Sequence, residues 1–263
     1  MNKLSFTQRV AVLVSVFIVA VGGLLFVEPI PQDPAYHLFA DTQSYLGLPN
    51  FGNVTSNVGF VIVGVLGLVT IFGRNDRDIF EQPLDPWPYI VFFFGILLVG
   101  TGSAYYHANP DSERLVWDRL PMVVGFMSLF AAFIADRIHG RVGVVYLLPI
   151  LIAVGILSLV YWEWTKAQGL GDLRFYGLVQ FYPMIALPLI CWLFPRSRYT
   201  DGRYLAWVIG WYGVAKVLEY FDVGVFDLLG NTISGHSLKH LLSAVATYMI
   251  LRMLVQSKLK RSP

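Results

Sequence analysis

The sequence predicts an all-α membrane protein that crosses the bilayer several times as one helical bundle. Of its 263 residues, 56% are hydrophobic and only 14% are charged, which is far too apolar for a soluble domain of this length. Crossing the hydrocarbon core takes about 20 apolar residues in a helix, and runs of that length recur along the whole chain. The loops between them are too short for a second domain, so we expect a single transmembrane domain over residues 1–263.

Six apolar runs predict membrane helices directly. They cover residues 10–27, 54–73, 88–107, 120–135, 142–162 and 175–195. Segments 203–222 and 233–255 have the length of a span but contain charged residues and histidines. The first run follows Lys3 and Arg9 as a signal peptide would, yet it is longer than a usual h-region and no small-x-small cleavage pattern follows it. The prediction is therefore eight helices.

The distribution of basic residues predicts the orientation, because Lys and Arg accumulate on the cytoplasmic side of short loops. With eight spans, one side carries only Arg114, Arg119, Lys166 and Arg174, and the other loop and terminal basic residues lie on the side of both termini. We expect both termini in the cytoplasm. The short loops and the lack of an ER-retrieval tail favour a bacterial inner membrane.

Charge and cysteine content exclude other classes of partner and site. The net charge is only +2, so the sequence has no strongly basic face of the kind that would indicate nucleic-acid binding. The single cysteine, Cys191, excludes a disulfide framework and a cysteine zinc site. The oligomeric state cannot be read from the sequence.

A small set of polar residues within the spans marks the candidate site, because ionisable side chains are costly in lipid and usually functional. Ser103 and His107 lie one helical turn apart at the end of the third run. Asp118 opens the fourth run, and His236 and His240 form an i, i+4 pair at the start of the last. In the eight-span topology all five lie near the non-cytoplasmic face. Gly100 and Gly102, beside Ser103, would permit close helix approach.

This combination of side chains is typical of a catalytic zinc site. Three neutral imidazoles leave a fourth metal position open, and the metal lowers the pKa of a bound water to about 7. Asp118 has the chemistry to take that water's proton, and Ser103 could donate to the oxyanion that forms.

Simpler interpretations exist for each residue. A His-x-x-x-His pair also serves as a haem ligand or a hydrogen-bonded packing pair. A serine within a span usually bonds back to its own helix. An aspartate shortly before a proline, as Asp118 is before Pro121, is usually an N-cap. The convergence of three segments at one membrane level favours the metal site.

At these residues the chain resembles the alkaline ceramidase family, part of a wider group of seven-helix membrane hydrolases. The matching pieces are Asn53-Val-Thr-Ser56-Asn57, Gly102-Ser103-x-x-x-His107, Asp118-x-x-Pro121-Met122 and His236-x-x-x-His240, within about residues 41–255. The resemblance implies Zn²⁺ bound by His107, His236 and His240, and hydrolysis of the amide of a ceramide-like membrane lipid. Asp118 would act near the activated water and Ser103 would support the transition state. A helix over about 8–28 would precede the family's seven.

Three departures from the family pattern affect these expectations. Animal members carry an acidic, calcium-binding cluster before the Asn-x-x-Ser-Asn segment, whereas this chain has Asn50 three residues before Asn53 and only Asp33 and Asp41 upstream. Calcium binding is therefore doubtful. Arg119 stands where those members have an acid, and Ser237-Leu238-Lys239 replaces an aromatic-rich spacer. The identity of the lipid is the weakest inference.

Other functions remain open at this point. The same zinc site could cleave a lipid ester, a receptor or transporter could keep a structural zinc, and a b-type haem could use the histidine pair. The remaining polar residues have structural interpretations: Lys216 and Glu219 neutralise each other or else line the cavity, Gln180 and Glu163 are structural, and His37 and His139 are solvated in loops.

Overall fold

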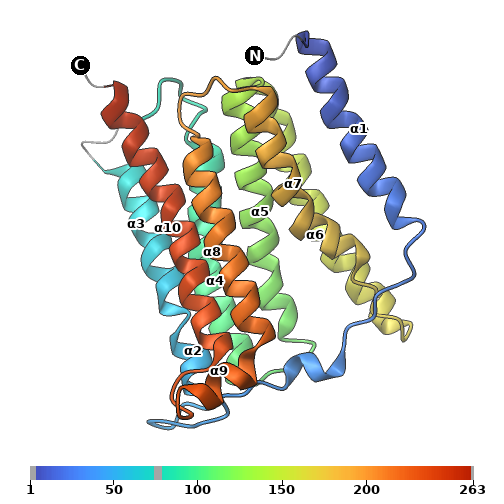
Figure 1. The fold of residues 1–263 in the computed structure, drawn as a ribbon, viewed down its shortest axis with the longest axis vertical. Coiled ribbons are helices and arrows are strands. Elements are labelled where there is room, and N and C mark those ends of the chain that lie inside the picture. The colour runs from blue at the N-terminus through green and yellow to red at the C-terminus, as the bar shows by residue number, and fades with distance from the viewer. Residues whose placement is uncertain (1–3, 74–78, 262–263) are drawn as a thin grey trace.

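The computed structural model describes residues 4–73 and 79–261, and in these ranges the chain folds into a bundle of long helices without named strands (Figure 1). The start of α1 and the end of α10 lie at the same end of the bundle, which we call the termini end (Figure 1). The short helices α2 and α9 lie at the opposite end, which we call the histidine end (Figure 1). Because the first and the last long helix have their outer ends on the same side of the bundle, the chain crosses the bundle an even number of times.

The helices follow the apolar runs closely. Their bounds are α1 Phe6–Leu24, the 3₁₀ turn η1 Pro34–His37, α2 Phe51–Thr55, α3 Val58–Phe72, α4 Trp87–Ala108, α5 Leu115–Arg137, the π-helical turn η2 Val142–Leu147, α6 Leu148–Ala167, α7 Arg174–Leu193, α8 Gly202–Tyr220, α9 Asp222–Leu228 and α10 Gly235–Arg261. The all-α membrane bundle predicted from the sequence is confirmed.

Seven segments in the described ranges are long and apolar enough to cross a membrane: α1, α2 with α3, α4, α5, η2 with α6, α7 and α10. The chain is thus a multi-pass membrane protein. Helix α8, which carries Arg203, Lys216 and Glu219, is not among the seven, yet it runs beside α10 through the bundle (Figure 1). It completes the eight helices that the sequence predicted.

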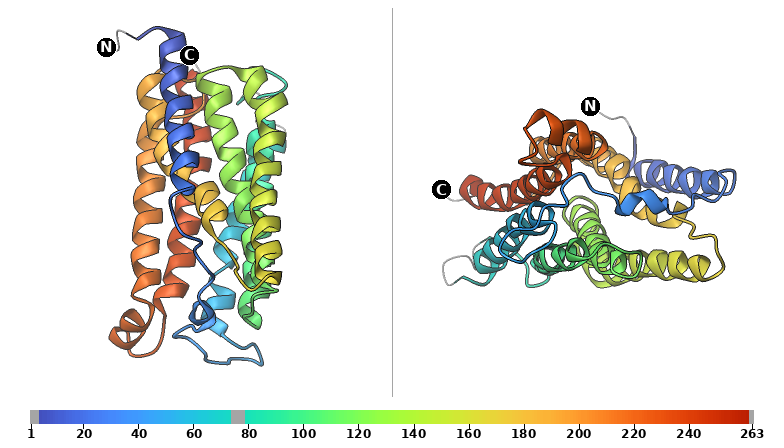
Figure 2. Two further views of the ribbon diagram at one scale, coloured as in Figure 1. Left: turned by 90° about the vertical axis from the view of Figure 1, so that its right-hand side faces the viewer. Right: turned by 90° about the horizontal axis from the view of Figure 1, so that it is seen from below.

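Helix α1 lies outside the main bundle, as expected for an extra N-terminal helix (Figure 2). It begins with a capping box in which the Ser5 and Gln8 side chains each accept from the other's backbone N–H, and it buries no residue. Its contacts are with α7: Phe17 packs edge-on against Tyr182, and Arg9 donates to the Leu193 carbonyl. The seven remaining long helices form the packed core.

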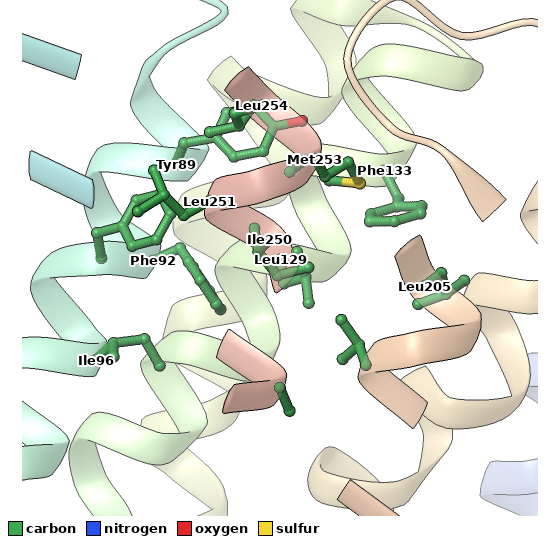
Figure 3. Close-up of a cluster of buried hydrophobic side chains, with 14 of the residues drawn as sticks. Tyr89, Phe92, Ile96, Leu129, Phe133, Leu205, Ile250, Leu251, Met253 and Leu254 are labelled. Carbon is green, nitrogen blue, oxygen red and sulfur yellow. The ribbon is translucent and has the colours of Figure 1, made fainter. Parts of the chain in front are cut away.

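The termini half of the bundle is filled by apolar side chains from α4, α5, α8 and α10 (Figure 3). Phe92 and Phe133 interdigitate there with Ile250 and Leu254 (Figure 3). Close packing of this kind is a main source of helix association in lipid, where no hydrophobic force drives helices together. It makes this half a rigid scaffold for the polar residues at the other end.

A long connecting segment, residues 25–50, crosses the histidine end beneath the bundle between α1 and α2 (Figure 2). Asp172, in the α6–α7 loop, accepts from the Ile30 N–H at 3.3 Å, and the Leu173 N–H donates to the Ile30 carbonyl at 2.8 Å. Asp222 accepts from the Ala40 N–H at 2.9 Å. The segment is thereby fastened at both ends below the site.

Candidate metal centre

Three histidines from two helices meet at the histidine end. His107 lies in the last turn of α4, and His236 and His240 lie in the first two turns of α10. One ring nitrogen from each residue lies within 4.8 Å of the others, and all three side chains are buried. The prediction that these residues converge is confirmed.

The geometry of the cluster fits a metal ion. The Nε2 atoms of His107 and His236 are 3.2 Å apart, and two nitrogens bound to one tetrahedral zinc at 2.0–2.1 Å would be about 3.3 Å apart. His240 Nδ1 pairs with the Ser56 hydroxyl at 2.9 Å, while its buried Nε2 has no hydrogen-bond partner among the described residues. A neutral imidazole has one donor and one acceptor nitrogen. Binding of a metal would use the acceptor that His240 otherwise leaves unpaired.

The start of α10 is held where its histidines face α4. Asp222 accepts from the His236 N–H at 2.7 Å, which satisfies one of the free donors of the helix N-terminus. A Cβ on Gly235 would lie 2.2 Å from the Leu218 carbonyl oxygen, so only glycine permits this close approach of α8 and α10. Backbone contacts therefore set the direction of the ligand helix.

The Asn-x-x-Ser-Asn segment supports the histidines from α2. The Asn53 side-chain oxygen accepts from Ser237 Oγ at 2.9 Å and from Ser234 Oγ at 3.1 Å. Asn53 is fully buried. Because Ser56 in the same segment pairs with His240 Nδ1, the motif fixes both the position of α10 and the ring orientation of one ligand. Partners of this kind orient metal-binding imidazoles.

Asp118 and Ser103 lie together beside the cluster. Gly102 of α4 packs against the backbone of Trp117 in α5, so the neighbours Ser103 and Asp118 lie at the same helix contact, and both are buried. Helix α5 starts at Leu115, one turn earlier than the predicted 120, so Asp118 is inside its first turn and Arg114 is the N-cap residue. The alternative interpretation of Asp118 as an N-cap was therefore wrong, and Pro121 lies inside the helix.

Pro121 has a structural consequence for the site. Proline has no N–H to donate to the carbonyl four residues earlier, which here is that of Trp117. A Cβ on Gly102 would lie only 2.2 Å from this carbonyl oxygen, and one on Gly100 would meet Val61 of α3 at 2.5 Å. The two glycines of α4 therefore permit the close packing predicted for them, and Ser103 is brought to Asp118.

Three charged residues lie next to the histidines. Lys239 Nζ is 3.1 Å from Glu219 Oε1 and 3.2 Å from His236 Nε2. Lys216 pairs with the same Glu219 from the other side. The predicted pairing of Lys216 with Glu219 is confirmed, but Lys239 joins it and extends the ion pair to a candidate metal ligand.

The connecting segment covers the histidines. The Phe39 ring centroid lies 4.7 Å from that of His107 and 4.4 Å from that of His236. His37 Nδ1 pairs with the Tyr106 hydroxyl at 2.9 Å and Nε2 with Ser112 Oγ at 3.0 Å. Burial lowers the pKa of His37, against the raising effect of Asp111. His37 is thus an anchored residue and not the solvated one predicted, whereas His139 is exposed as expected.

Arg119 is buried, although the topology grouped it with loop residues. Its guanidinium lies 4.6 Å from the Trp162 ring centroid, 4.8 Å from that of Tyr176 and 5.5 Å from that of Tyr36. One amino group donates to the Gln32 side chain at 2.6 Å. Such cation–π contacts compensate in part for the loss of water around the charge. Arg119 thereby ties the connecting segment to the bundle.

The acidic residues upstream of Asn53 have backbone partners. Asp41 accepts from the Gln43 N–H at 2.9 Å and from the Gly52 N–H at 3.0 Å, and Asp33 accepts from the Ala35 N–H at 2.8 Å. In the described ranges the three histidines are the only group of three or more candidate ligands that lie together.

The other polar residues have local partners. Gln180 donates to the Tyr212 hydroxyl at 2.7 Å, and Glu163 pairs with Lys166 at 2.6 Å. The functional neighbours that sequence reasoning missed are Ser56, Asp222 and Phe39. Ser56 could have been found because it belongs to the Asn-x-x-Ser-Asn motif, and Asp222 because it is a charged residue in an otherwise apolar segment. No feature of the sequence pointed to Phe39.

Comparison with known proteins assigns the family. The sequence model described as Ceramidase matches residues 48–262, a range that contains the three histidines, Ser103 and Asp118. No curated protein matches the sequence at a significant level. The match covers well over half of the chain and leaves out α1, in keeping with its place outside the packed core. The chain therefore belongs to the Ceramidase family, which implies a membrane hydrolase that acts on ceramide-like lipids.

Proposed function

We propose that the protein is a zinc-dependent hydrolase that cleaves the amide bond of a ceramide-like lipid. The observation that carries this proposal is the unpaired, buried Nε2 of His240, which faces two further imidazoles while Ser56 holds its other nitrogen. Three nitrogen ligands and no thiolate suit zinc among the common catalytic metals, and they leave a fourth position for water or substrate.

Zinc in this position would supply a water of lowered pKa and polarise the scissile carbonyl. His107, His236 and His240 are the residues that hold it. In the hydrolysis, the water oxygen bonds to the carbonyl carbon, the carbon–nitrogen bond breaks, and the products are a fatty acid and a free amine. Asp118 takes a proton from the water and returns it to the leaving nitrogen.

Ser103 has a different role from the oxyanion donor that its chemistry suggested. A hydroxyl carries a single proton, and the Asp118 carboxylate, buried beside Ser103 where α4 meets α5, can accept a hydrogen bond from it. We propose that this bond holds Asp118 in the orientation that proton transfer requires. With Ser103 in this role, another group must donate a hydrogen bond to the amide carbonyl oxygen as it becomes an oxyanion.

Two measurements on purified protein test the function. Metal analysis should find about one zinc per chain. Incubation with ceramide should release free fatty acid and a sphingoid base. Release of fatty acid plus a lysolipid from phospholipid, with ceramide untouched, would show an ester hydrolase instead. Zinc without any lipid product would indicate a receptor or transporter, and a visible haem spectrum would contradict the zinc assignment.

We also propose that the histidine end faces the non-cytoplasmic side and that both termini are cytoplasmic, because Lys and Arg gather on the termini side. The seven candidate spans together with α8 make eight helices, and the shared end of α1 and α10 fits that even number of crossings (Figure 1). A reporter enzyme fused after Pro263 should be active only when it can fold in the cytoplasm. Activity only on the opposite side would contradict this orientation.

A further inference from the structure

Lys239 is a cation in contact with a candidate metal ligand. It lies on α10 between His236 and His240, and its Nζ is 3.2 Å from His236 Nε2. Glu219 of α8 holds the ammonium from the other side at 3.1 Å. The side chain is still 17% accessible, so it is not completely covered by other side chains.

The two partners of Lys239 differ in what they can offer once a metal is bound. A neutral imidazole has a single lone pair, so His236 Nε2 cannot accept from Lys239 and bind a metal at the same time. Glu219 Oε1 can accept from Lys239 whether or not a metal is bound to His236. Metal binding through His236 Nε2 would therefore free one N–H of an ammonium that Glu219 keeps beside His236.

The freed donor lies where negative charge develops. Lys239 contacts His236, and Asp118 is buried beside Ser103, one helical turn before His107 on α4, so the ammonium and the proposed base both lie beside the histidine cluster. An amide carbonyl attacked there gains negative charge on its oxygen, and a preorganised donor at that atom lowers the barrier. In the proposed function Ser103 donates to Asp118, which leaves this task to another group.

We infer that Lys239 is a further catalytic residue, which donates a hydrogen bond to the carbonyl oxygen of the scissile amide as that oxygen becomes an oxyanion. The inference rests on the proposed function. Lys239 keeps its three protons throughout: one N–H stays on Glu219, one turns from His236 to the substrate oxygen, and no covalent bond to the lysine forms. Glu219 acts as the positioning residue for the ammonium.

Lys239→Met tests the inference on the intact protein through two readouts. The kcat for ceramide should fall by about a hundred- to a thousandfold, the cost of losing one oxyanion donor, with little change in KM. Zinc affinity, measured by competition with a chelator, should rise by about tenfold or more. A unit positive charge a few ångströms from a dication costs about that much even at a water-like dielectric, and the competing donor to His236 is also removed.

Lys216→Met is the matched control. It removes a lysine from the same carboxylate, but Lys216 is 42% accessible and has no contact with His236 among the described residues. Both kcat and zinc affinity should stay within about threefold of wild type. If the unpaired Glu219 prevents folding of Lys239→Met, the double variant Lys239→Met/Glu219→Gln removes both charges and should show the same loss of kcat.

The outcomes separate this inference from the function on which it rests. A fall in kcat together with tighter zinc binding supports it, because a residue needed only for packing would weaken both. A kcat unchanged in Lys239→Met, or zinc affinity lost together with kcat, overturns it while zinc binding and hydrolysis by wild type keep the proposed function. Wild type that binds no zinc overturns both.

Discussion

The bundle has two buried clusters of charged and polar side chains, one at each end, and they differ in how completely they are paired. At the termini end, Asp136 of α5 is 1% exposed and accepts from the Arg198, Tyr199 and Thr200 N–H groups and from the Thr200 hydroxyl. Its neighbour Arg137 donates to the Phe194 and Thr200 carbonyls. These hydrogen bonds all join the end of α5 to the loop between α7 and α8.

At the histidine end the pairing is incomplete. His107 Nδ1 and His240 Nε2 are buried without a partner among the described residues, and Lys239 and His107 both point at the single acceptor of His236. Leaving buried polar groups unpaired costs about 1–3 kcal/mol each. A closed network is what a structural loop anchor needs, whereas unpaired acceptors that face one another are what a ligand site needs.

The largest expected effect on zinc binding and hydrolysis comes from removal of a metal ligand at the histidine end. His236→Ala or His240→Ala should abolish zinc binding and reduce hydrolysis to background, because two imidazoles do not complete a catalytic zinc site. His139→Ala, at the exposed histidine, is the matched control and should keep both. Zinc content unchanged in both ligand variants would show that the unpaired nitrogens have no metal to bind.

The next effect is loss of the proposed base. Asp118→Asn keeps the size of the side chain but removes its basicity, so turnover should fall by about a hundred- to ten-thousandfold while zinc stays bound. Asp227→Asn, at an exposed carboxylate of α9, is the control. If Asp118→Asn loses its zinc, the carboxylate is a ligand and not a base.

A smaller effect is expected at Ser103. Ser103→Ala removes the proposed hydrogen bond to Asp118 and should lower kcat by about tenfold, less than the loss of an oxyanion donor. The sharper measurement is the combination with Asp118→Asn, since a residue that acts only through Asp118 adds nothing once the carboxylate is gone. A full additional loss in the double variant would give Ser103 a role of its own.

The smallest change in catalysis is expected from a substitution at Asp136, in the fully paired cluster at the termini end. Asp136→Asn turns an amide N–H toward backbone donors and leaves them unpaired, so thermal stability should fall by about 1–3 kcal/mol. Zinc content and kcat of the folded protein should match wild type, again with Asp227→Asn as the control. A change in zinc affinity would show that the two ends are coupled, contrary to the distinction drawn between them.

The sequence predicts the architecture well and the site in part. Long apolar runs define the helices, and the position of the histidines at span ends places them at one level, since both depend on local composition. The contact of Ser56 with His240 joins residues 184 positions apart and cannot be read from either segment alone. Burial of Arg119 depends on aromatic rings from three distant elements, which loop position does not reveal.

Errors at the start of α5 have a local cause. Pro121 is compatible with a first turn, and the charged residues before it gave no apolar periodicity, so the helix was predicted to start at 120. The structure extends it to Leu115, where the Asp111 side chain accepts from the Arg114 N–H at 2.7 Å. The extension moves Asp118 from a cap position into the first turn of the helix.

The Phe39 ring, packed on His107 and His236, makes loading of the site a question of rates as well as of affinity. On the side that this ring covers, ions and chelators reach the imidazoles after the connecting segment moves, and Asp222 accepts from both the Ala40 and the His236 N–H groups. Opening of the cover thus loosens the helix that carries two ligands. Exchange should be slow, and short chelator treatments will overstate how tightly the ion is held.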